Sequence, residues 1–289
     1  MEGRPLKKYI PWQIKLILKI ILSKLAINRR LLHRLGIFRH GGMDTVDYSQ
    51  AIFNRHFQHF KPIDEGFTVL ELGPGNGITN GLYAHALGAA KTFLVDHGDH
   101  ATRDMSFYHR IVESLPIRKT RSTMLRHVQS FEELLDAAQI ICLAEGLKSL
   151  RSIESESVDF VFSNAVLEHV WLDEFQATME ELYRILKPGG LCSHEVDIKD
   201  HLGASLNNLR FSKKIWESRT FRESGFYTNR IRYEEMLQRF REAGFKVRVI
   251  QTWKWDKLPL KRSCLSRSFN HLSDEDLCVY CFDVLLTKA

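Results

Sequence analysis

The stretch Phe67-Thr-Val-Leu-Glu-Leu-Gly-Pro-Gly-Asn-Gly77 decides the fold of this chain. Its first six residues are mostly apolar or β-branched, which is typical of a buried β-strand. Three glycines at alternate positions follow directly, and they let the backbone turn sharply and approach a ligand closely. Residues 78–87 have the pattern of a helix, whose first N–H groups would point toward that ligand. The stretch therefore predicts a strand, a ligand-binding turn and a helix in succession.

A second apolar run, Lys91-Thr-Phe-Leu-Val95, ends in Asp96. A carboxylate about twenty residues past a glycine turn is where a ribose diol would be held. The glycine spacing is G-x-G-x-G, whereas a dinucleotide turn has G-x-G-x-x-G. Glu71 precedes the first glycine, where an acid suits a cationic ligand and would repel a pyrophosphate. The two runs together predict an adenosine-containing cofactor that carries positive charge.

Residues 69–77 resemble the first motif of class I S-adenosylmethionine-dependent methyltransferases. The segment Ser157-Val-Asp-Phe-Val-Phe-Ser-Asn-Ala-Val-Leu-Glu-His-Val170 is similar to the fourth-strand motif of that family. Residues 182–190 resemble its next helix and the turn into strand five, and residues 241–247 resemble its junction into strand six. The resemblance implies an α/β fold with a doubly wound, mostly parallel, seven-stranded sheet of the Rossmann-like methyltransferase type.

The resemblance also implies which residues hold S-adenosylmethionine. The glycine turn and the acid before it would bind the methionine portion, and Asp96 would bind the ribose hydroxyls. Glu145, after an expected third strand at 140–144, is the candidate for adenine, with a solvated loop charge as the alternative. The polar end of the fourth strand would line the sulfonium side. The full predicted set is Glu71, Gly73, Gly75, Asn76, Gly77, Asp96, Glu145, Ser163 and Asn164.

Methyl transfer from a sulfonium is an in-line displacement, so the protein mainly has to align the nucleophile with the methyl group. An oxygen nucleophile must also lose its proton, which requires a His or carboxylate nearby. We expect this base at the carboxyl end of the fifth strand, where His201 and Asp197 are the best candidates. His169 is an alternative near the end of the fourth strand. The transfer requires no metal, although Asp197, Asp200 and His201 could together ligate Mg or Mn.

Two long connections, residues 202–245 and 253–276, are longer than crossovers require and are expected to form the acceptor side. The first mixes aromatic residues with Asn and Arg, which suits a pocket that stacks on rings and hydrogen-bonds hydroxyls or an anion. The alternative is a loop whose aromatic residues fold into the core. The predicted acceptor-binding residues are Arg210, Trp216, Tyr227, Asn229 and Arg230.

The net charge of +6 is concentrated at the N-terminus. Residues 1–40 hold ten Lys or Arg and one acid, whereas the remainder holds 31 basic and 34 acidic residues. Residues 12–27 are strongly apolar but interrupted by three lysines, so they are a poor transmembrane candidate. We expect residues 1–45 to be a basic amphipathic extension that contacts a membrane surface through residues 9–35, ahead of a methyltransferase domain at 46–289. The alternative is a helix packed on the domain's own core.

The preferred interpretation is a methyltransferase for a small molecule or glycan, with O-methylation of a saccharide or lipid-linked intermediate. A C-methyltransferase acting on an isoprenoid quinone or other lipid is the alternative enzyme, and a non-catalytic cofactor-binding partner protein is the alternative of another class. A nucleic-acid acceptor is not expected, because the body is net negative and Ser163-Asn164-Ala165-Val166 differs from the tetrad of base-amine methyltransferases. The five cysteines favour a reducing compartment, hence a cytoplasmic protein, peripheral on the membrane.

Overall fold

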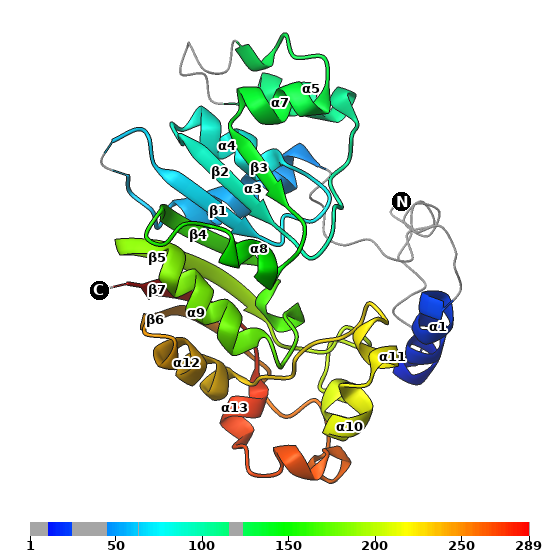
Figure 1. Ribbon diagram of the computed structural model, residues 1–289. Coiled ribbons are helices and arrows are strands. Elements are labelled where there is room, and N and C mark those ends of the chain that lie inside the picture. The colour runs from blue at the N-terminus through cyan, green and yellow to red at the C-terminus, as the bar shows by residue number, and fades with distance from the viewer. Residues whose placement is uncertain (1–10, 25–44, 63, 116–123, 289) are drawn as a thin grey trace.

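Seven strands form one sheet in the computed structural model, which describes residues 11–24, 45–62, 64–115 and 124–288 (Figure 1). The strand order is β3-β2-β1-β4-β5-β7-β6. Only the two pairings made by β7 are antiparallel. The predicted doubly wound, mostly parallel sheet is therefore confirmed. The strands are β1 Thr68–Leu72, β2 Lys91–Val95, β3 Ile140–Leu143, β4 Val158–Asn164, β5 Leu186–Asp197, β6 Lys246–Lys254 and β7 Val279–Thr287.

Helices cover the two faces of the sheet in separate layers (Figure 1). Successive strand residues point to opposite faces, so Val69 joins one apolar cluster and Leu70 joins the other. The cluster of Val69 includes residues of α3 Val46–Phe57, α4 Thr79–Ala86, α5 Met105–Ser114 and α7 Phe131–Ala137. The cluster of Leu70 includes residues of α8 Leu147–Arg151, α9 Phe175–Ile185 and α12 Tyr233–Glu242. Burial on both faces explains the continuous apolar runs in the sequence.

Short elements beyond the carboxyl ends of the strands form two further apolar clusters. One contains Leu202, Trp216, Phe226 and Tyr227, and we call it the insertion cluster. The other contains Leu206, Leu209, Leu260, Leu265 and Leu277. The elements are η2 Leu167–His169, η3 Asn207–Arg210, α10 Lys213–Trp216, α11 Arg219–Arg222, η4 Arg262–Cys264, η5 Arg267–Phe269 and α13 Asp274–Cys278.

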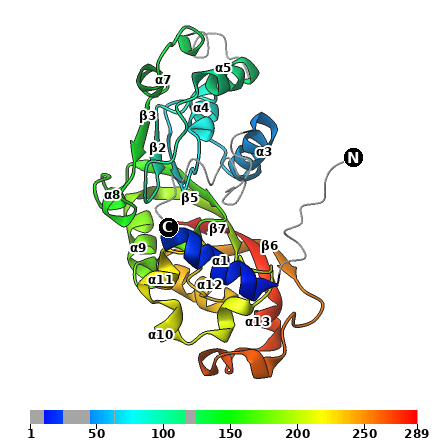
Figure 2. The ribbon, with the colours of Figure 1, turned by 90° about the vertical axis from the view of Figure 1, so that its right-hand side faces the viewer.

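Helix α1, Trp12–Lys24, packs on the insertion cluster and does not stand apart from the domain. Trp12, Leu16 and Ile20 pack against the insertion cluster, and Figures 1 and 2 both show α1 beside α11. The opposite face of α1 exposes Ile14, Ile17, Leu18 and Ile21, each with 46–55% of its surface accessible. The helix thus has two apolar faces, of which the protein covers one.

No helix among the described residues is long and apolar enough to cross a bilayer. The remainder of the expected basic extension, residues 1–10 and 25–44, lies outside the described residues. The boundary expected near residue 45 stays a prediction.

Candidate functional site

The glycine turn after β1 has two positions that favour glycine for different reasons. Gly73 has φ +73°, and a Cβ atom there would collide with the side chain of Val166, which follows β4. Gly75 has φ +65°, but a Cβ atom there would meet nothing within 4 Å. Gly73 is therefore required by packing within the protein. Gly75 instead leaves open space above the turn, where a ligand can approach the backbone.

Glu71 is a buried carboxyl directly beneath this turn. The side-chain amide of Asn80, on α4, donates to its Oε1 over 2.6 Å, and its Oε2 has no hydrogen-bond partner among the described residues. Burial raises the pKa of Glu71 to about 8; the Asn80 bond counteracts this shift, and the nearby charge of Asp96 adds to it. A cationic ligand would favour the ionised form of Glu71.

Asp96 ends β2 on the other side of the turn. It accepts a hydrogen bond from the Gly75 N–H over 3.4 Å and one from the His97 N–H over 2.7 Å. Burial works to raise the pKa of Asp96, but bonds from the His97 side chain and backbone hold it below its ordinary value. Asp96 is therefore ionised at neutral pH and can accept hydroxyl donors.

The strand ends bring the other predicted cofactor residues to the same edge. The Gly146 N–H donates to the Asp96 carbonyl over 2.8 Å, which places the segment after β3 beside the end of β2. Glu145 lies there with its side chain 61% exposed and paired with Lys148 over 2.5 Å. The Asn76 carbonyl accepts from the Thr102 N–H over 2.8 Å, which joins the turn to the loop after β2. Their ligand roles stay predictions.

Ser163 lies behind the site rather than on its surface. Its side chain is fully buried and bonded to Nδ1 of His194 over 2.7 Å. Asn164 is more accessible, and its Oδ1 accepts from Nε2 of His56 over 3.3 Å. Since that N–H is the donor, Nδ1 of His56 accepts from the hydroxyl of Ser193 over 2.9 Å. Burial lowers the pKa of His56 to about 4, so the ring is neutral and fixes this pattern.

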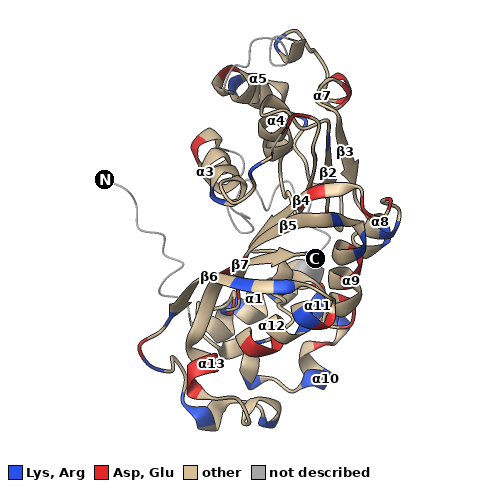
Figure 3. Cartoon of the chain, turned by 90° about the vertical axis from the view of Figure 1, so that its left-hand side faces the viewer, with Lys and Arg blue, Asp and Glu red and all other residues tan. Residues whose placement is uncertain are grey.

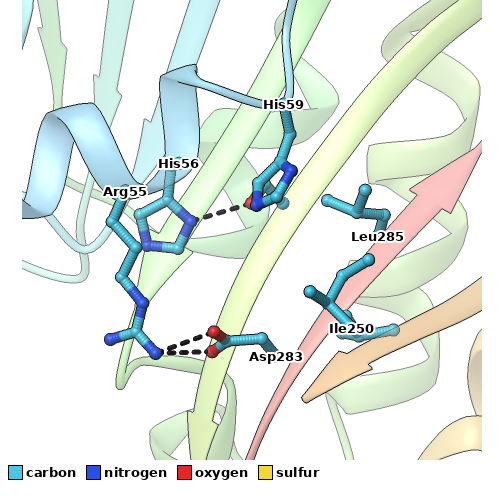
Figure 4. A pocket seen from close by; sticks show the side chains of 8 residues that line it. Arg55, His56, His59, Ile250, Asp283 and Leu285 are labelled. Atoms are coloured by element: carbon cyan, nitrogen blue, oxygen red, sulfur yellow. Dashed lines mark hydrogen bonds and ion pairs between the residues drawn. The ribbon is translucent and has the colours of Figure 1, made fainter.

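Helix α3 also contributes to this edge of the sheet, and no sequence pattern indicated it. Figure 4 shows the small pocket between α3 and the sheet, with His56 bonded to β5 and Arg55 reaching Asp283 on β7. Arg55 donates twice to Asp283 over 2.8 Å and also pairs with Glu195 on β5. These contacts anchor α3 across β5 and β7 next to the end of β4. A His at the second-to-last position of an apolar-faced helix carries no signal for such a role.

Two of the carboxylates considered at the end of β5 are engaged in local structure. Asp197 pairs with Lys199 over 2.5 Å. Asp200 is buried and accepts hydrogen bonds from the backbone N–H groups of Leu202, Gly203, Ser205 and Asn207 and from the Asn207 side chain. Asp200 is thereby committed to shaping the loop. The considered ion site of Asp197, Asp200 and His201 is thus not supported by this geometry.

The two candidate histidines, by contrast, meet at the carboxyl edge. The rings of His169 and His201 are stacked with centroids 4.8 Å apart and planes at 21°. Nδ1 of His169 lies 2.8 Å from the carbonyl of Tyr227. A carbonyl only accepts, so this nitrogen carries a hydrogen and donates it. Nζ of Lys19, on α1, lies 3.5 Å from the carbonyl oxygen of His201.

Glu168, next to His169, received no role from the sequence although it lies within the quoted motif. It is 1% exposed, and no hydrogen bond with good geometry reaches either carboxylate oxygen. Burial raises its pKa well above the ordinary value, which the backbone N–H groups of Glu168 and Asp197 only partly offset. Its environment could not be found from the sequence, because the groups that act on it, Asp197 and Lys199, lie about thirty residues away.

Most of the predicted acceptor-binding side chains make contacts with other residues of the protein itself. Trp216 is fully buried and donates to the Thr228 carbonyl over 2.7 Å. Asn229 donates to the carbonyls of Leu167 and Val170, so it braces η2. The others have similar internal contacts: Tyr227 donates to Glu217, Arg230 donates to the Phe211 carbonyl, and Arg210 contacts Asn207 and the Trp12 ring. The alternative of aromatic residues folded into a core describes Trp216 correctly.

Comparisons with known proteins agree with the motifs. Residues 120–193 match a family model described as methyltransferase domain. No curated protein matches the sequence. The match covers 74 of the 289 residues and supports the predicted methyltransferase domain.

Similar solved structures are all distant in sequence. Phosphoethanolamine N-methyltransferase 2 of Haemonchus contortus is 14% identical with a TM-score of 0.47, covering 82% of this chain and 52% of its own. A methyltransferase of Thermotoga maritima is 19% identical with a TM-score of 0.42, covering 93% and 98%. One of Archaeoglobus fulgidus is 13% identical with a TM-score of 0.45, covering 84% and 95%. This chain spans about half the length of the Haemonchus protein.

Replacing Gly73 and Gly75 by Ala should separate packing from ligand binding. Gly73→Ala should lower the free energy of unfolding by about 2–4 kcal/mol, because it adds a collision with Val166 to an unfavourable positive φ. Val166→Ala should recover part of this loss in a double-mutant cycle measured by urea unfolding. Gly75→Ala should cost about 1 kcal/mol of stability but abolish cofactor binding. Equal stability losses in the two variants would contradict this assignment.

Cofactor affinity should depend on pH through Glu71. Below pH 8 the buried carboxyl is protonated without ligand, and a cation favours its ionised form. Affinity for S-adenosylmethionine should therefore rise from pH 6.5 to 8.5, by at most about 25-fold for a pKa near 8, and then level off. Calorimetry on Glu71→Gln, which keeps an oxygen for Asn80, should show a flatter profile. Titration of the ligand itself is common to both proteins and cancels in their ratio; identical profiles would exclude Glu71.

Proposed function

We propose that this protein transfers the methyl group of S-adenosylmethionine to a hydroxyl oxygen of a small-molecule or glycan acceptor presented at a lipid surface. The observation that carries the proposal is the glycine turn with two carboxyls, Glu71 beneath it and Asp96 beside it. Open space above Gly75 supports a bound ligand at this position. The two carboxyls support a cationic ligand with hydroxyl groups, which describes a sulfonium nucleoside.

The proposed reaction is one in-line displacement. The acceptor hydroxyl loses its proton, its oxygen attacks the methyl carbon, and the bond between that carbon and sulfur breaks. Sulfur keeps the electron pair, so the products are the methyl ether and S-adenosylhomocysteine. Alignment of the two reactants can contribute roughly 7–11 kcal/mol to lowering the barrier. The stacked pair His169 and His201 lies on the acceptor side and activates the hydroxyl.

The position of α1 supports an acceptor at a lipid surface. Its inner face packs on the insertion cluster, and Lys19 contacts the residue His201 itself. Its outer face is an apolar stripe of Ile14, Ile17, Leu18 and Ile21, and we call it the α1 stripe. The described part of α1 contains lysines but no acidic residue (Figure 3). A helix with this composition binds anionic interfaces through its apolar face.

The orientation of α1 differs from the expected one in one respect. Lys15 and Lys19 are partly buried on the side that faces the domain, rather than lying opposite the apolar face in open water. Apolar contact therefore carries the proposed membrane binding, and the basic charge of residues 1–40 adds a general attraction to anionic lipid. The acceptor side would then face the bilayer, which favours a lipid-linked substrate.

Label transfer tests the proposed activity directly. Full-length protein with methyl-labelled S-adenosylmethionine and fractionated lipid and glycan extracts should move label into a base-stable ether. Asp96→Ala should weaken cofactor binding by about 10- to 100-fold, because it removes charge-assisted hydrogen bonds. Asp99→Ala, an exposed carboxylate three residues later that pairs with Arg103, is the matched control and should bind normally.

The other interpretations are distinguished by the same assay. Label on carbon, identified by fragmentation, would replace O-methylation with C-methylation of a lipid. Cofactor binding without transfer to any fraction would favour a non-catalytic partner protein. Absence of cofactor binding by the folded protein would overturn the proposal.

The α1 stripe should control association with vesicles. The double variant Ile17→Ser/Ile21→Ser should reduce binding to vesicles of phosphatidylcholine and phosphatidylglycerol by roughly 10- to 100-fold, because two half-exposed apolar side chains no longer enter the interface. Sedimentation of vesicles with bound protein measures this. Ile141→Ser/Ile250→Ser changes two similarly exposed isoleucines elsewhere and is the control. Equal losses in both double variants, or none in either, would rule out the stripe.

A further inference from the structure

The ends of β4 and β5 bring one carboxyl group and two imidazoles together. Glu168 and His169 lie on η2, directly after β4, and His201 follows β5. One ligand atom from each residue lies within 4.8 Å of those from the other two. We propose that Glu168, His169 and His201 bind a divalent transition-metal ion on the acceptor side of the methyl-transfer site.

The orientation of His169 supports this site. An imidazole that binds a metal usually donates its other N–H to a carbonyl or carboxylate, which fixes the ring and its tautomer. Nδ1 of His169 donates to the Tyr227 carbonyl, so Nε2 is the nitrogen left to bind a metal. The stacked His201 ring lies 4.8 Å away. The two stacked rings thus bring two imidazole ligands to one place.

Glu168 supplies the negative charge and is itself the second observation that points to a ligand. Its carboxyl group is buried, neither oxygen has a hydrogen bond of good geometry among the described residues, and Lys199, a cation that acts on it, is paired with Asp197. Burying an ionised carboxylate without a partner is costly. A divalent cation between Glu168 and the two histidines would offset that cost.

The ligand set indicates the class of ion. One carboxylate oxygen and two imidazole nitrogens suit Zn²⁺, Mn²⁺, Fe²⁺ or Co²⁺ better than Mg²⁺, which prefers oxygen ligands alone. Metal–ligand distances are about 2.0–2.2 Å, so ligand atoms as far as 4.8 Å apart must move closer together when an ion binds. The site lies close to the glycine turn, because Val166 packs against Gly73 and its carbonyl accepts from the His169 N–H over 2.8 Å.

The role of the ion rests on the proposed function, whereas its binding does not. A bound divalent ion lowers the pKa of a coordinated hydroxyl. The acceptor would lose its proton to solvent and attack the methyl carbon as in the displacement above, with sulfur again keeping the electron pair. At least one coordination position remains for acceptor or water, since the protein supplies three ligands.

Metal binding is measured on full-length, tag-free protein stripped with a chelator, without cofactor or acceptor. Calorimetric titration with Zn²⁺, Mn²⁺ and Co²⁺ should show one ion per chain for at least one of these metals, and Co²⁺ should give visible absorption bands. His169→Ala and His201→Ala should each weaken binding at least 30-fold. No binding of any of the three metals, or binding that survives both substitutions, would overturn the proposal.

Three further variants guard against misfolding and against a different site. Glu168→Gln should weaken metal binding at least 10-fold while keeping the melting temperature of the metal-free protein, because an amide of nearly the same shape replaces the buried carboxyl group. A lower melting temperature with unchanged metal affinity would show a purely structural role. His97→Ala and His100→Ala test the exposed group Asp96, His97 and His100. They should leave the affinity unchanged; loss of binding there would move the ion to that group.

The last experiment measures methyl transfer with and without the ion. If the ion activates the acceptor, chelation should slow transfer at saturating cofactor without changing cofactor affinity, and the metal that binds should restore the rate. Transfer that continues unchanged in stripped protein would overturn this role even where the ion binds. Failure of the proposed function would instead leave metal binding intact and abolish transfer under both conditions.

Discussion

The contact between the backbone of Gly73 and the side chain of Val166 is the constraint on which the site depends. Gly73 lies in the turn that faces the cofactor position, and Val166 begins the segment that carries Glu168 and His169. Since Gly73 has no Cβ, the two segments approach until Val166 occupies the space a side chain would take. The cofactor side and the acceptor side are thereby held at a fixed separation, which in-line transfer requires.

The strands of the sheet and the turn after β1 could be predicted from the sequence, because local patterns specify them. The strand Lys91–Val95 was predicted with its observed bounds, since an apolar run bounded by polar residues indicates a buried parallel strand. The predicted cofactor roles of Glu71, Asp96 and the glycines have the same origin, because strand, turn and carboxylate follow one another within thirty residues. The family motifs then connected residues 67–250 in a single order.

The acceptor side could not be predicted in the same way, because its contacts join segments far apart in the chain. His56 contacts Ser193 and Asn164, which are more than a hundred residues away in the sequence. Glu168 lies near the end of β5, about thirty residues away. Trp216 and Asn229 are residue types that are common in binding pockets, but here they donate hydrogen bonds to backbone carbonyls of the protein. Residue type alone does not distinguish a side chain that contacts a ligand from one that supports the segment beside it.

The loop closed by Asp200 has a consequence for how such a protein can change over evolution. One carboxylate sets the shape of residues 200–207 through backbone N–H groups, which every residue except proline has. The backbone limits exchange at Gly203, where a Cβ atom would lie 3.3 Å from the Asn207 side chain, and at Ala204, where φ is +52°. Elsewhere in the loop, side chains can change without disturbing the hydrogen bonds that hold the segment next to His201.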